Sequence, residues 1–212
     1  MNIEKFEFNM LPVNTYVLYD QSKKAAIIDP GCYTQSEKER LKQFIESNNL
    51  IPERLLNTHL HFDHIFGNPF VKKSYGLQIE ANDGDQNWLN SIHERVKLFG
   101  LTYNETMPPI GRILNEGDIV TFGNTELSVL HIPGHSPGSL LFYSEKNGVL
   151  FTGDVLFKES IGRSDFPDGN EVALIEGIKS KLFSLPNDTI VFPGHGPSTT
   201  IGHEKKYNLY LR

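Results

Sequence analysis

The chain has 212 residues, of which 38% are hydrophobic, 11% aromatic and 22% charged, with a formal net charge of -6 at pH 7. This is the composition of an ordinary globular protein and excludes long disordered segments. An acidic balance without any block of basic residues also excludes the usual surface of a nucleic-acid-binding protein, so we expect a small-molecule partner. A chain of this length fits a single domain spanning residues 1–212.

The start of the chain contains acidic residues and no uninterrupted apolar run, so it predicts neither a signal peptide nor a membrane anchor. We therefore expect a cytoplasmic protein that does not bind membranes. The single cysteine, Cys32, permits no internal disulfide. Two interpretations of Cys32 stay open: a reactive thiol or soft metal ligand after the turn Asp29-Pro30-Gly31, or a half-buried thiol without a chemical role.

Five short strand-like runs, each closed by turn residues, occur in the first half of the chain. They are residues 6–8, 15–19, 25–28, 55–57 and 77–81. Between the third and fourth runs, Thr34 and Glu37 have the spacing of a helical capping box. Leu41 and Ile45 then supply an apolar face at helical intervals, and Asn48 is expected to end the helix.

The pattern changes in residues 83–112, which we interpret as an insertion into the domain. An amphipathic helix is expected there, followed by a loop with two adjacent prolines; the apolar face of the helix consists of Trp88, Ile92, Val96 and Phe99. Two interpretations stay open for this segment. It forms a lid over a substrate cleft, since long irregular connections are disproportionately functional, or it packs on the scaffold and merely connects.

Two hairpins and a helix are expected in the second half. Tight turns at Gly123-Asn124 and Asn147-Gly148, each flanked by strand-like runs, predict the hairpins. A helix is expected from Glu171, with an apolar stripe that consists of Val172, Ile175, Ile178 and Leu182. A last strand follows at residues 189–192. Strands and helices thus occur in both halves, as in an α+β fold.

The clearest chemical signal is the run from Thr58 to His64, which lies between a strand-like run and a probable helix. Its four metal-capable side chains are His59, His61, Asp63 and His64. Alternation in an extended segment places His59 and His61 on the same side, and the following turn can aim the other two at a neighbouring position. Imidazoles and carboxylates suit zinc and comparable divalent metals, whereas iron–sulfur or soft-metal sites would need cysteines.

Three further candidates each follow a strand-like run and sit beside glycines: His135, Asp154 and His195. Glycine lets the backbone turn sharply at a strand end, so that the neighbouring side chain can point into a cleft. The isolated His93, His131 and His203 lack this setting, and we leave them out of the metal site. The sequence therefore predicts a metal centre built from seven side chains in four segments.

Five blocks together resemble the metallo-β-lactamase superfamily over nearly the whole chain: Asp29-Pro30-Gly31, residues 58–64, Gly134-His135, Thr152-Gly153-Asp154 and Gly194-His195. The resemblance implies an α+β fold, the αβ/βα four-layer sandwich, with two sheets face to face, helices outside and the metals at one edge. It implies that His59, His61 and His135 hold a first metal ion. It also implies that Asp63, His64 and His195 hold a second, and that Asp154 bridges both.

Within that superfamily the chain is most similar to small bacterial hydrolases of the glyoxalase II (hydroxyacylglutathione hydrolase) type. Asp154 stands where β-lactamases of the best-known zinc class have a cysteine, which argues against antibiotic hydrolysis. The resemblance implies a metal-dependent hydrolase that cleaves a small thioester, such as an S-acyl or hydroxyacyl glutathione, by attack of a metal-bridging hydroxide. It implies two divalent ions, zinc or alternatively iron or manganese, and catalytic roles for Asp63 and Asp154.

The sequence departs from the longer glyoxalase II relatives, which carry a C-terminal helical domain with basic residues for glutathione. Where those relatives have a lysine and a tyrosine after the bridging aspartate, this chain has Arg163 and Asp165. We expect both to contact substrate, with Arg163 as an anchor for a carboxylate through its planar fork. The alternative is a structural ion pair between these two residues.

Three other functions stay open. A persulfide dioxygenase, which is an oxidoreductase with one iron, shares the stretch from Gly162 to Phe166 but binds its iron through two histidines and the aspartate. A hydrolase of another small ester or lactone would use the same two-metal centre. A metal-binding module without catalysis is the third alternative, because fold resemblance alone does not establish an activity.

Overall fold

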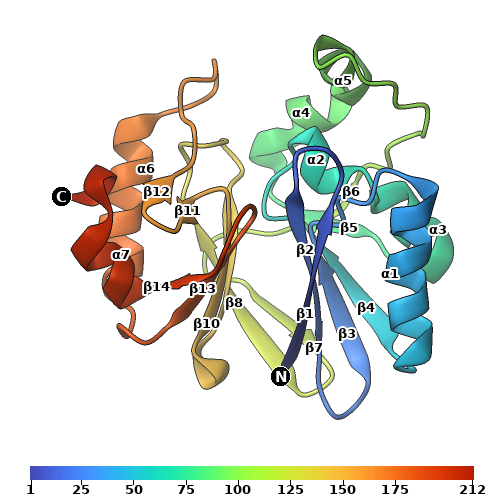
Figure 1. The fold of residues 1–212 in the computed structure, drawn as a ribbon, viewed down its shortest axis with the longest axis horizontal. Coiled ribbons are helices and arrows are strands. Elements are labelled where there is room, and N and C mark those ends of the chain that lie inside the picture. Colours follow the sequence, from blue (N-terminus) through green and yellow to red (C-terminus); the bar gives the residue numbers. More distant parts are fainter.

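The computed structural model describes residues 1–212 and contains two six-stranded sheets packed face to face. Helices cover the outer face of each sheet, so the layers run helix, sheet, sheet, helix (Figure 1). The expected α+β four-layer sandwich is therefore confirmed. None of the helices combines the length and apolar character that crossing a membrane requires.

The first sheet is formed by the N-terminal half of the chain. In spatial order its strands are β1 (Asn2–Phe8), β2 (Val13–Tyr19), β3 (Lys24–Ile28), β4 (Ile51–Leu56), β5 (Ile79–Ala81) and β6 (Ile110–Ile113). The first three pair antiparallel and the last three continue in parallel from β3. Parallel pairing needs crossover connections, and helices α1 (Gln35–Ser47) and α3 (Asn68–Tyr75) provide the first two.

The second sheet is formed by the C-terminal half. In spatial order its strands are β14 (Thr199–Thr200), β13 (Ile190–Pro193), β10 (Val149–Gly153), β9 (Leu140–Ser144), β8 (Thr125–His131) and β7 (Ile119–Phe122). Only β10 and β13 pair in parallel. Helices α6 (Glu171–Gly177) and α7 (Ile201–Tyr207) belong to this half, and a separate small hairpin consists of β11 (Leu156–Phe157) and β12 (Ser160–Ile161).

Side-chain alternation along the strands creates three apolar layers. On β2, Leu18 points into the cluster between the sheets, whereas Val17 points into the cluster beneath the first helical layer. On β9, Phe142 lies between the sheets and Leu141 packs under the second helical layer. Because successive residues of a strand face opposite sides, strands covered on both faces are apolar throughout, which hides the period-two pattern in the sequence.

Local sequence signals are confirmed where they are strongest. Thr34 accepts a hydrogen bond from the Glu37 N–H, and the Glu37 side chain accepts from the Thr34 N–H, so the capping box starts α1; the helix ends before Asn48. Gly123-Asn124 joins β7 to β8 in an antiparallel hairpin. Strands β9 and β10 also pair antiparallel, through a short 3₁₀ turn (Glu145–Asn147) that ends at a glycine with φ of +61°.

The expected apolar stripe of the helix from Glu171 is partly wrong. Val172 is 65% exposed, whereas Leu174, Ile178 and Leu182 are buried in a row of fourth neighbours. Successive residues of an α-helix turn by about 100°, so Val172 lies about 200° around the helix from Leu174 and faces solvent. The helix also continues as a π-helix over Ile178–Leu182, which shifts the face further.

The segment at residues 83–112 contains two short helices rather than the single one expected. A 3₁₀ turn (Asp83–Asp85) leads into α4 (Gln86–Asn90) and α5 (Ile92–Leu98), which are separated at Ser91. Trp88, Ile92 and Val96 are buried as expected, but Phe99 is 59% exposed because it lies beyond the end of α5. The last residues of the segment belong to strand β6.

Candidate metal centre

All seven predicted metal-binding side chains lie together at one end of the sandwich. They stand in the loop after β4, in the short helix α2 (Phe62–Ile65), and in the loops that follow β8, β10 and β13. Both sheets thus contribute their strand ends to one edge. Four of the five histidines and Asp63 are buried, while Asp154 and His195 are partly exposed. The residues therefore form the floor of a site that is open on one side.

One group of ligands consists of His59, His61 and His135. Nε2 of His135 lies 2.9 Å from Nδ1 of His61 and 3.3 Å from Nε2 of His59. One nitrogen atom from each ring lies within 4.8 Å of the others, and all three residues are buried. Such a cluster of ring nitrogens offers one position for a metal ion.

A second group consists of Asp63, His64 and His195. Nε2 of His64 lies 3.3 Å from Nε2 of His195, which in turn lies 3.4 Å from Oδ2 of Asp63. The donor atoms of this group again lie within 4.8 Å of one another. The sequence motif places its members next to those of the first group, since Asp63 and His64 follow His61 directly on α2.

The carboxylate of Asp154 lies between the two groups. Its Oδ1 atom is 3.4 Å from Nε2 of His64, and its Oδ2 atom is 3.6 Å from Nε2 of His135 and 3.5 Å from that of His195. One carboxylate thus reaches a ring of each group. This is the placement that the resemblance implied for a bridging residue.

In most of these imidazole rings, the nitrogen that points away from the cluster lies within hydrogen-bond distance of an acceptor in the protein. Nδ1 of His135 donates to the Arg163 carbonyl oxygen at 2.8 Å, and Nδ1 of His195 faces that of Pro12 at 3.2 Å. The hydroxyl hydrogen of Thr58 goes to the Asp29 carboxylate, so this hydroxyl can only accept from Nδ1 of His59. A proton held at Nδ1 leaves the lone pair on Nε2, which is the atom that faces the cluster.

Burial and neighbouring charges lower the pKa of some of these histidines and raise that of others. Burial, together with the neighbouring imidazoles, holds the pKa of His59 well below its usual range and lowers that of His61 to about 3. For His64, burial also favours the neutral ring, but the carboxylates of Asp154 and Asp63 outweigh it and raise the pKa well above the usual range. His59 and His61 therefore present neutral rings, whereas the second group attracts a proton in the absence of a competing cation.

The side chains at this site fit divalent metal ions. Five imidazoles and two carboxylates are the donor set that zinc, iron and manganese accept. Oδ1 of Asp154 is buried and accepts no hydrogen bond within the chain, which is costly for a carboxylate oxygen unless a cation is beside it. Neutral imidazoles at His59 and His61 are also the protonation state that metal binding requires.

Glycines allow the strand ends to approach closely. A Cβ atom on Gly194 would lie 2.2 Å from Oδ1 of Asp154 and 2.8 Å from Cε1 of His64. Gly153 adopts φ of +49°, and a Cβ there would lie 2.3 Å from the Thr58 hydroxyl. The positions next to Asp154 and His195 therefore need glycine for space, and Gly153 needs it also for its positive φ.

Two further buried carboxylates lie beside the predicted ligands, and that of Asp29 has an oxygen within 4.8 Å of ring nitrogens of His59 and His64. Asp29 accepts from the Thr58 N–H at 2.7 Å and lies 3.0 Å from Nδ1 of His64, so its oxygens are used by protein donors. Sequence reasoning quoted Asp29 only as part of a motif. Asp85 was missed entirely, because its stretch carries no recognisable pattern.

Asp85 ties the loops of the first ligand group to the segment at residues 83–112. It accepts from the N–H of Leu60 at 3.0 Å and from that of Gly138 at 2.7 Å, and from the Ser136 hydroxyl at 2.9 Å. Leu60 lies between His59 and His61, while Ser136 follows His135. One buried carboxylate therefore fixes the two loops relative to each other.

Arg163 and Asp165 lie at the rim and pair with each other. Nε of Arg163 donates to Oδ1 of Asp165 at 2.8 Å, and both side chains are about 70% exposed. This is the ion pair that the sequence allowed as the alternative to a substrate contact. A role in binding substrate stays a prediction for both residues.

Neither Cys32 nor the isolated histidines join the metal centre. Cys32 is buried, and burial raises its thiol pKa to about 12, so it stays a protonated thiol. His93, His131 and His203 each contact another protein group instead: the Tyr103 carbonyl, the Pro137 carbonyl and the Glu159 carboxylate. All three therefore lie outside the cluster of metal-capable side chains.

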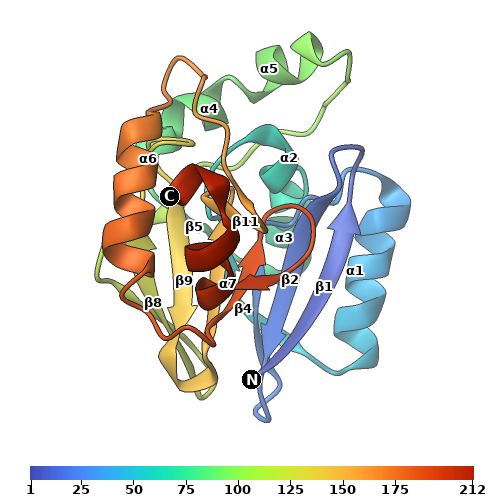
Figure 2. The same cartoon turned by 60° about the vertical axis from the view of Figure 1, so that its left-hand side comes forward.

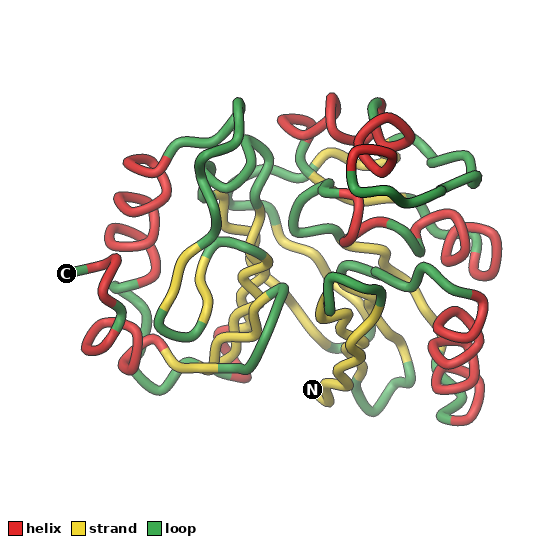
Figure 3. The backbone as a smooth tube through the Cα atoms, turned by 45° about the horizontal axis from the view of Figure 1, so that its top comes forward, coloured by secondary structure: helices red, strands yellow, loops and turns green.

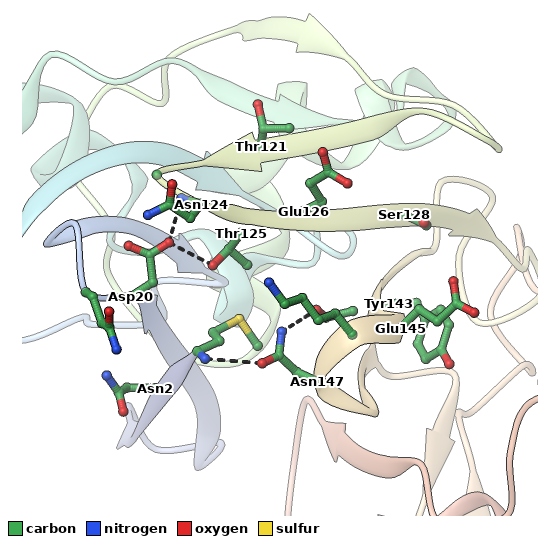
Figure 4. Close-up of a pocket in the computed structure, with 15 residues that line it drawn as sticks. Asn2, Asp20, Thr121, Asn124, Thr125, Glu126, Ser128, Tyr143, Glu145 and Asn147 are labelled. Atoms are coloured by element: carbon green, nitrogen blue, oxygen red, sulfur yellow. Dashed lines mark hydrogen bonds between the residues drawn. The ribbon is translucent and has the colours of Figure 1, made fainter.

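Two hollows differ in their relation to the metal centre. One, of about 500 Å³, adjoins His195 and is lined by Phe157, Lys158 and Pro197 among others. A larger one, of about 800 Å³, lies at the opposite ends of β8 and β10 (Figure 4). Its acid Asp20 already accepts from Asn124 N–H and the Thr125 hydroxyl, so we locate the functional site at the metal-capable cluster.

Comparison with known proteins agrees with this geometry. The family model described as the metallo-beta-lactamase superfamily matches residues 9–195. The chain is 40% identical, over its whole length and 98% of the relative, to hydroxyacylglutathione hydrolase GloC of Haemophilus influenzae. The sandwich and its edge of histidines and aspartates define a metal-dependent hydrolase. The chain belongs to the metallo-beta-lactamase superfamily.

Solved structures share the whole fold. BLEG-1, described as a B3 metallo-beta-lactamase, is 37% identical with a TM-score of 0.90, and each chain covers 99% of the other. TTHA1623, solved in a di-iron-bound form, is 34% identical with a TM-score of 0.87, covering 98% of this chain and 100% of its own. ETHE1 from Myxococcus xanthus is 26% identical with a TM-score of 0.78, covering 99% and 84%.

Proposed function

We propose that the protein is a dinuclear metal-dependent hydrolase that cleaves a small thioester such as an S-hydroxyacyl glutathione. The observation that carries this proposal is the placement of Asp154 between two three-residue groups, which offers two adjacent metal positions. The thioester is supported by the relative GloC, whose description names it a hydroxyacylglutathione hydrolase and which matches along nearly its full length.

In this proposal His59, His61 and His135 hold the first ion, Asp63, His64 and His195 the second, and Asp154 both. Bound ions would supply Lewis acidity for the substrate carbonyl and lower the pKa of a bound water. The protein's own contribution is to hold the donor atoms in place, through the acceptors behind the rings of His135, His195 and His64. Zinc is the proposed ion, and the di-iron form of TTHA1623 supports iron as the alternative.

Asp63 and Asp154 are the proposed catalytic carboxylates. Burial raises the pKa of Asp63, but His64 and the hydrogen bond from His195 lower it more, so the group stays ionised near neutral pH. An ionised carboxylate can accept a hydrogen bond from an attacking water and hold its proton. Asp154, whose pKa is held far below its usual range by His64 against the effect of burial, keeps the two ligand groups together.

The segment at residues 83–112 contributes a wall of the proposed substrate cleft. The ring of Trp88 on α4 lies 4.1 Å from that of His61, and Phe166 in the loop between β12 and α6 lies 5.4 Å from it. Figure 2 shows α4, α5 and this loop rising at the same end of the molecule. This contact supports the interpretation of the segment as a cover over the site.

The test is hydrolysis by metal-free protein that has been reloaded separately with zinc, iron or manganese. We expect the reloaded protein to hydrolyse S-lactoylglutathione and to lose that activity with a chelator. The same preparations are assayed with a β-lactam and with a simple lactone. Turnover of only the β-lactam or only the lactone would overturn the thioester assignment.

The persulfide dioxygenase is kept as the second candidate. The likeness to ETHE1, together with the shared stretch from Gly162 to Phe166, supports it. The two functions differ in their consumption of oxygen and in metal content. Oxygen uptake by iron-loaded protein with glutathione persulfide, without thioester hydrolysis, would favour this candidate.

A further inference from the structure

Two aromatic side chains from different halves of the molecule flank His61 on the outer side of the first ligand group. Trp88 comes from α4, and Phe166 comes from the loop before α6. Their ring centroids lie 6.0 Å apart, and Phe166 also lies 5.8 Å from the ring of His135. Together they form an apolar rim beside the metal centre. Figure 3, in which this end of the molecule is turned forward, shows that the backbone there consists of helices and loops from both halves.

An arginine side chain stacks on each of these two aromatic rings. The guanidinium carbon of Arg95 lies 3.3 Å from the ring centroid of Trp88, and that of Arg163 lies 4.5 Å from the centroid of Phe166. Stacking restricts the arginine side chain and keeps its planar fork at the rim of the site. In a chain with net charge -6, two cations thus lie against the aromatic rings that contact His61.

The two arginines differ in whether they already have a partner. Arg163 is paired with Asp165, whereas Arg95 forms no ion pair with any carboxylate of the chain. The one side-chain hydrogen bond of Arg95 runs from Nε to the Ser91 hydroxyl at 2.7 Å, one helical turn earlier. Both terminal nitrogens of this half-buried guanidinium are therefore free to pair with an anion.

We propose that Arg95, held on Trp88, is a substrate-binding residue that pairs with a carboxylate of the substrate's thiol carrier. The inference rests on the proposed thioester hydrolysis and specifies which thiols it favours. A bidentate pair with a carboxylate is geometrically specific and stronger than a neutral hydrogen bond. Small peptide thiols with free carboxylates are therefore preferred over thiols that lack them.

The structure supplies its own probe, because Trp88 is the only tryptophan of the chain. Metal-loaded protein is titrated with S-methylglutathione, a thioether that cannot be hydrolysed, and separately with its dimethyl ester. We expect saturable change of the Trp88 fluorescence with the free acid. The Kd for the free acid should rise about tenfold or more in Arg95→Gln, as for the loss of one charge-assisted pair, and the Kd for the ester should not change.

Arg40→Gln is the matched control. Arg40 also stacks on aromatic rings, 5.1 Å from the centroid of Phe6 and 5.8 Å from that of Phe8, but it stands on α1, away from the metal centre. The Kd of the Arg40→Gln variant for each of the two ligands should equal that of the unmodified protein. Arg95→Lys keeps the charge without the fork and should lie between the two, which separates a binding role from a folding defect.

Three results would overturn the inference: an unchanged Kd for the free acid in Arg95→Gln, an equal loss of affinity for acid and ester, or no binding of the free acid by the unmodified protein at millimolar concentration. The proposed function fails separately. If the protein binds S-methylglutathione through Arg95 but hydrolyses no thioester, the carboxylate contact stands and thioester hydrolysis is wrong. If it hydrolyses thioesters but Arg95→Gln binds normally, only the contact is wrong.

Discussion

Oδ2 of Asp29 lies 3.0 Å from Nδ1 of His64, and both side chains are fully buried. The same carboxylate accepts from the N–H and the hydroxyl of Thr58, whose oxygen faces Nδ1 of His59. One residue thus orients a ring in each of the two ligand groups. We infer that Asp29 determines the affinity of both metal positions without touching either.

Asp29→Asn is expected to weaken metal binding about 10- to 100-fold, because the amide offers a donor where His64 and Thr58 need acceptors. Competition with a chromogenic chelator measures this affinity. Asp20→Asn is the control, since Asp20 also accepts several hydrogen bonds but at the opposite end of the sandwich. Equal affinities in both variants would contradict the orienting role of Asp29.

Asp63→Asn is expected to reduce turnover by about 10²-fold or more with only modest metal loss, because the amide cannot hold the proton of an attacking water. His61→Ala should instead empty the first group, since Nδ1 of His61 is one of its three donors. Steady-state kinetics and metal analysis of the same preparations distinguish the two effects. Full activity in either variant would show that its role is wrongly assigned.

Gly194→Ala is expected to disturb the centre sterically. The added methyl group would lie 2.2 Å from Oδ1 of Asp154, so either that carboxylate or the loop must move. We expect loss of bound metal and of activity. Metal content after dialysis is the measurement.

Gly196→Ala is the control for a methyl group added to the same loop without a steric clash. Gly196 has φ of +73°, but nothing lies within 4 Å of a Cβ placed there. This substitution should cost about 1 kcal/mol of unfolding free energy from strain and retain the metal. Similar metal loss in both variants would refute the steric explanation.

Metal binding should depend on pH mainly through the second group. Although burial alone would lower both values, neighbouring carboxylates raise the pKa values of His64 and His195, whereas those of His59 and His61 are lowered. Near neutral pH the metal-free second group therefore holds protons that a metal ion must displace, whereas His59 and His61 of the first group hold none. Affinity at the second position should fall as pH decreases below the raised values.

Calorimetric titration in buffers of different ionisation enthalpy counts the displaced protons. We expect proton release when the second ion binds and little or none for the first. As pH is lowered, the second ion should leave first. Identical proton release for both ions would contradict the division between the groups.

The sequence predicted the elements whose signals are local. Thr34 and Glu37, three residues apart, determine the start of α1 through mutual hydrogen bonds. Gly123, with φ of +51°, allows the tight turn of the hairpin between β7 and β8. The metal-capable residues were predictable for a related reason, because the run from His59 to His64 is dense in ligands. Their division into two groups came from the resemblance. In the structure, the members of each group lie close to one another.

The features that sequence reasoning missed depend on contacts between distant segments. Asp85 is an ordinary acid in a polar stretch until the fold brings Leu60 and Gly138 to it. Arg95 was not singled out either, because its position on Trp88 beside His61 depends on how α4 meets the loop after β4. Which face of α6 is buried likewise depends on the surface on which the helix packs. The hydrophobic periodicity of the helix's own sequence does not determine that surface.

The most direct test of the account is an anomalous diffraction map, measured at the zinc absorption edge, from crystals of zinc-loaded protein. We predict two peaks, one contacted by His59, His61 and His135 and one by Asp63, His64 and His195, with Asp154 reaching both. A single peak, or none among these side chains, would contradict a two-metal centre.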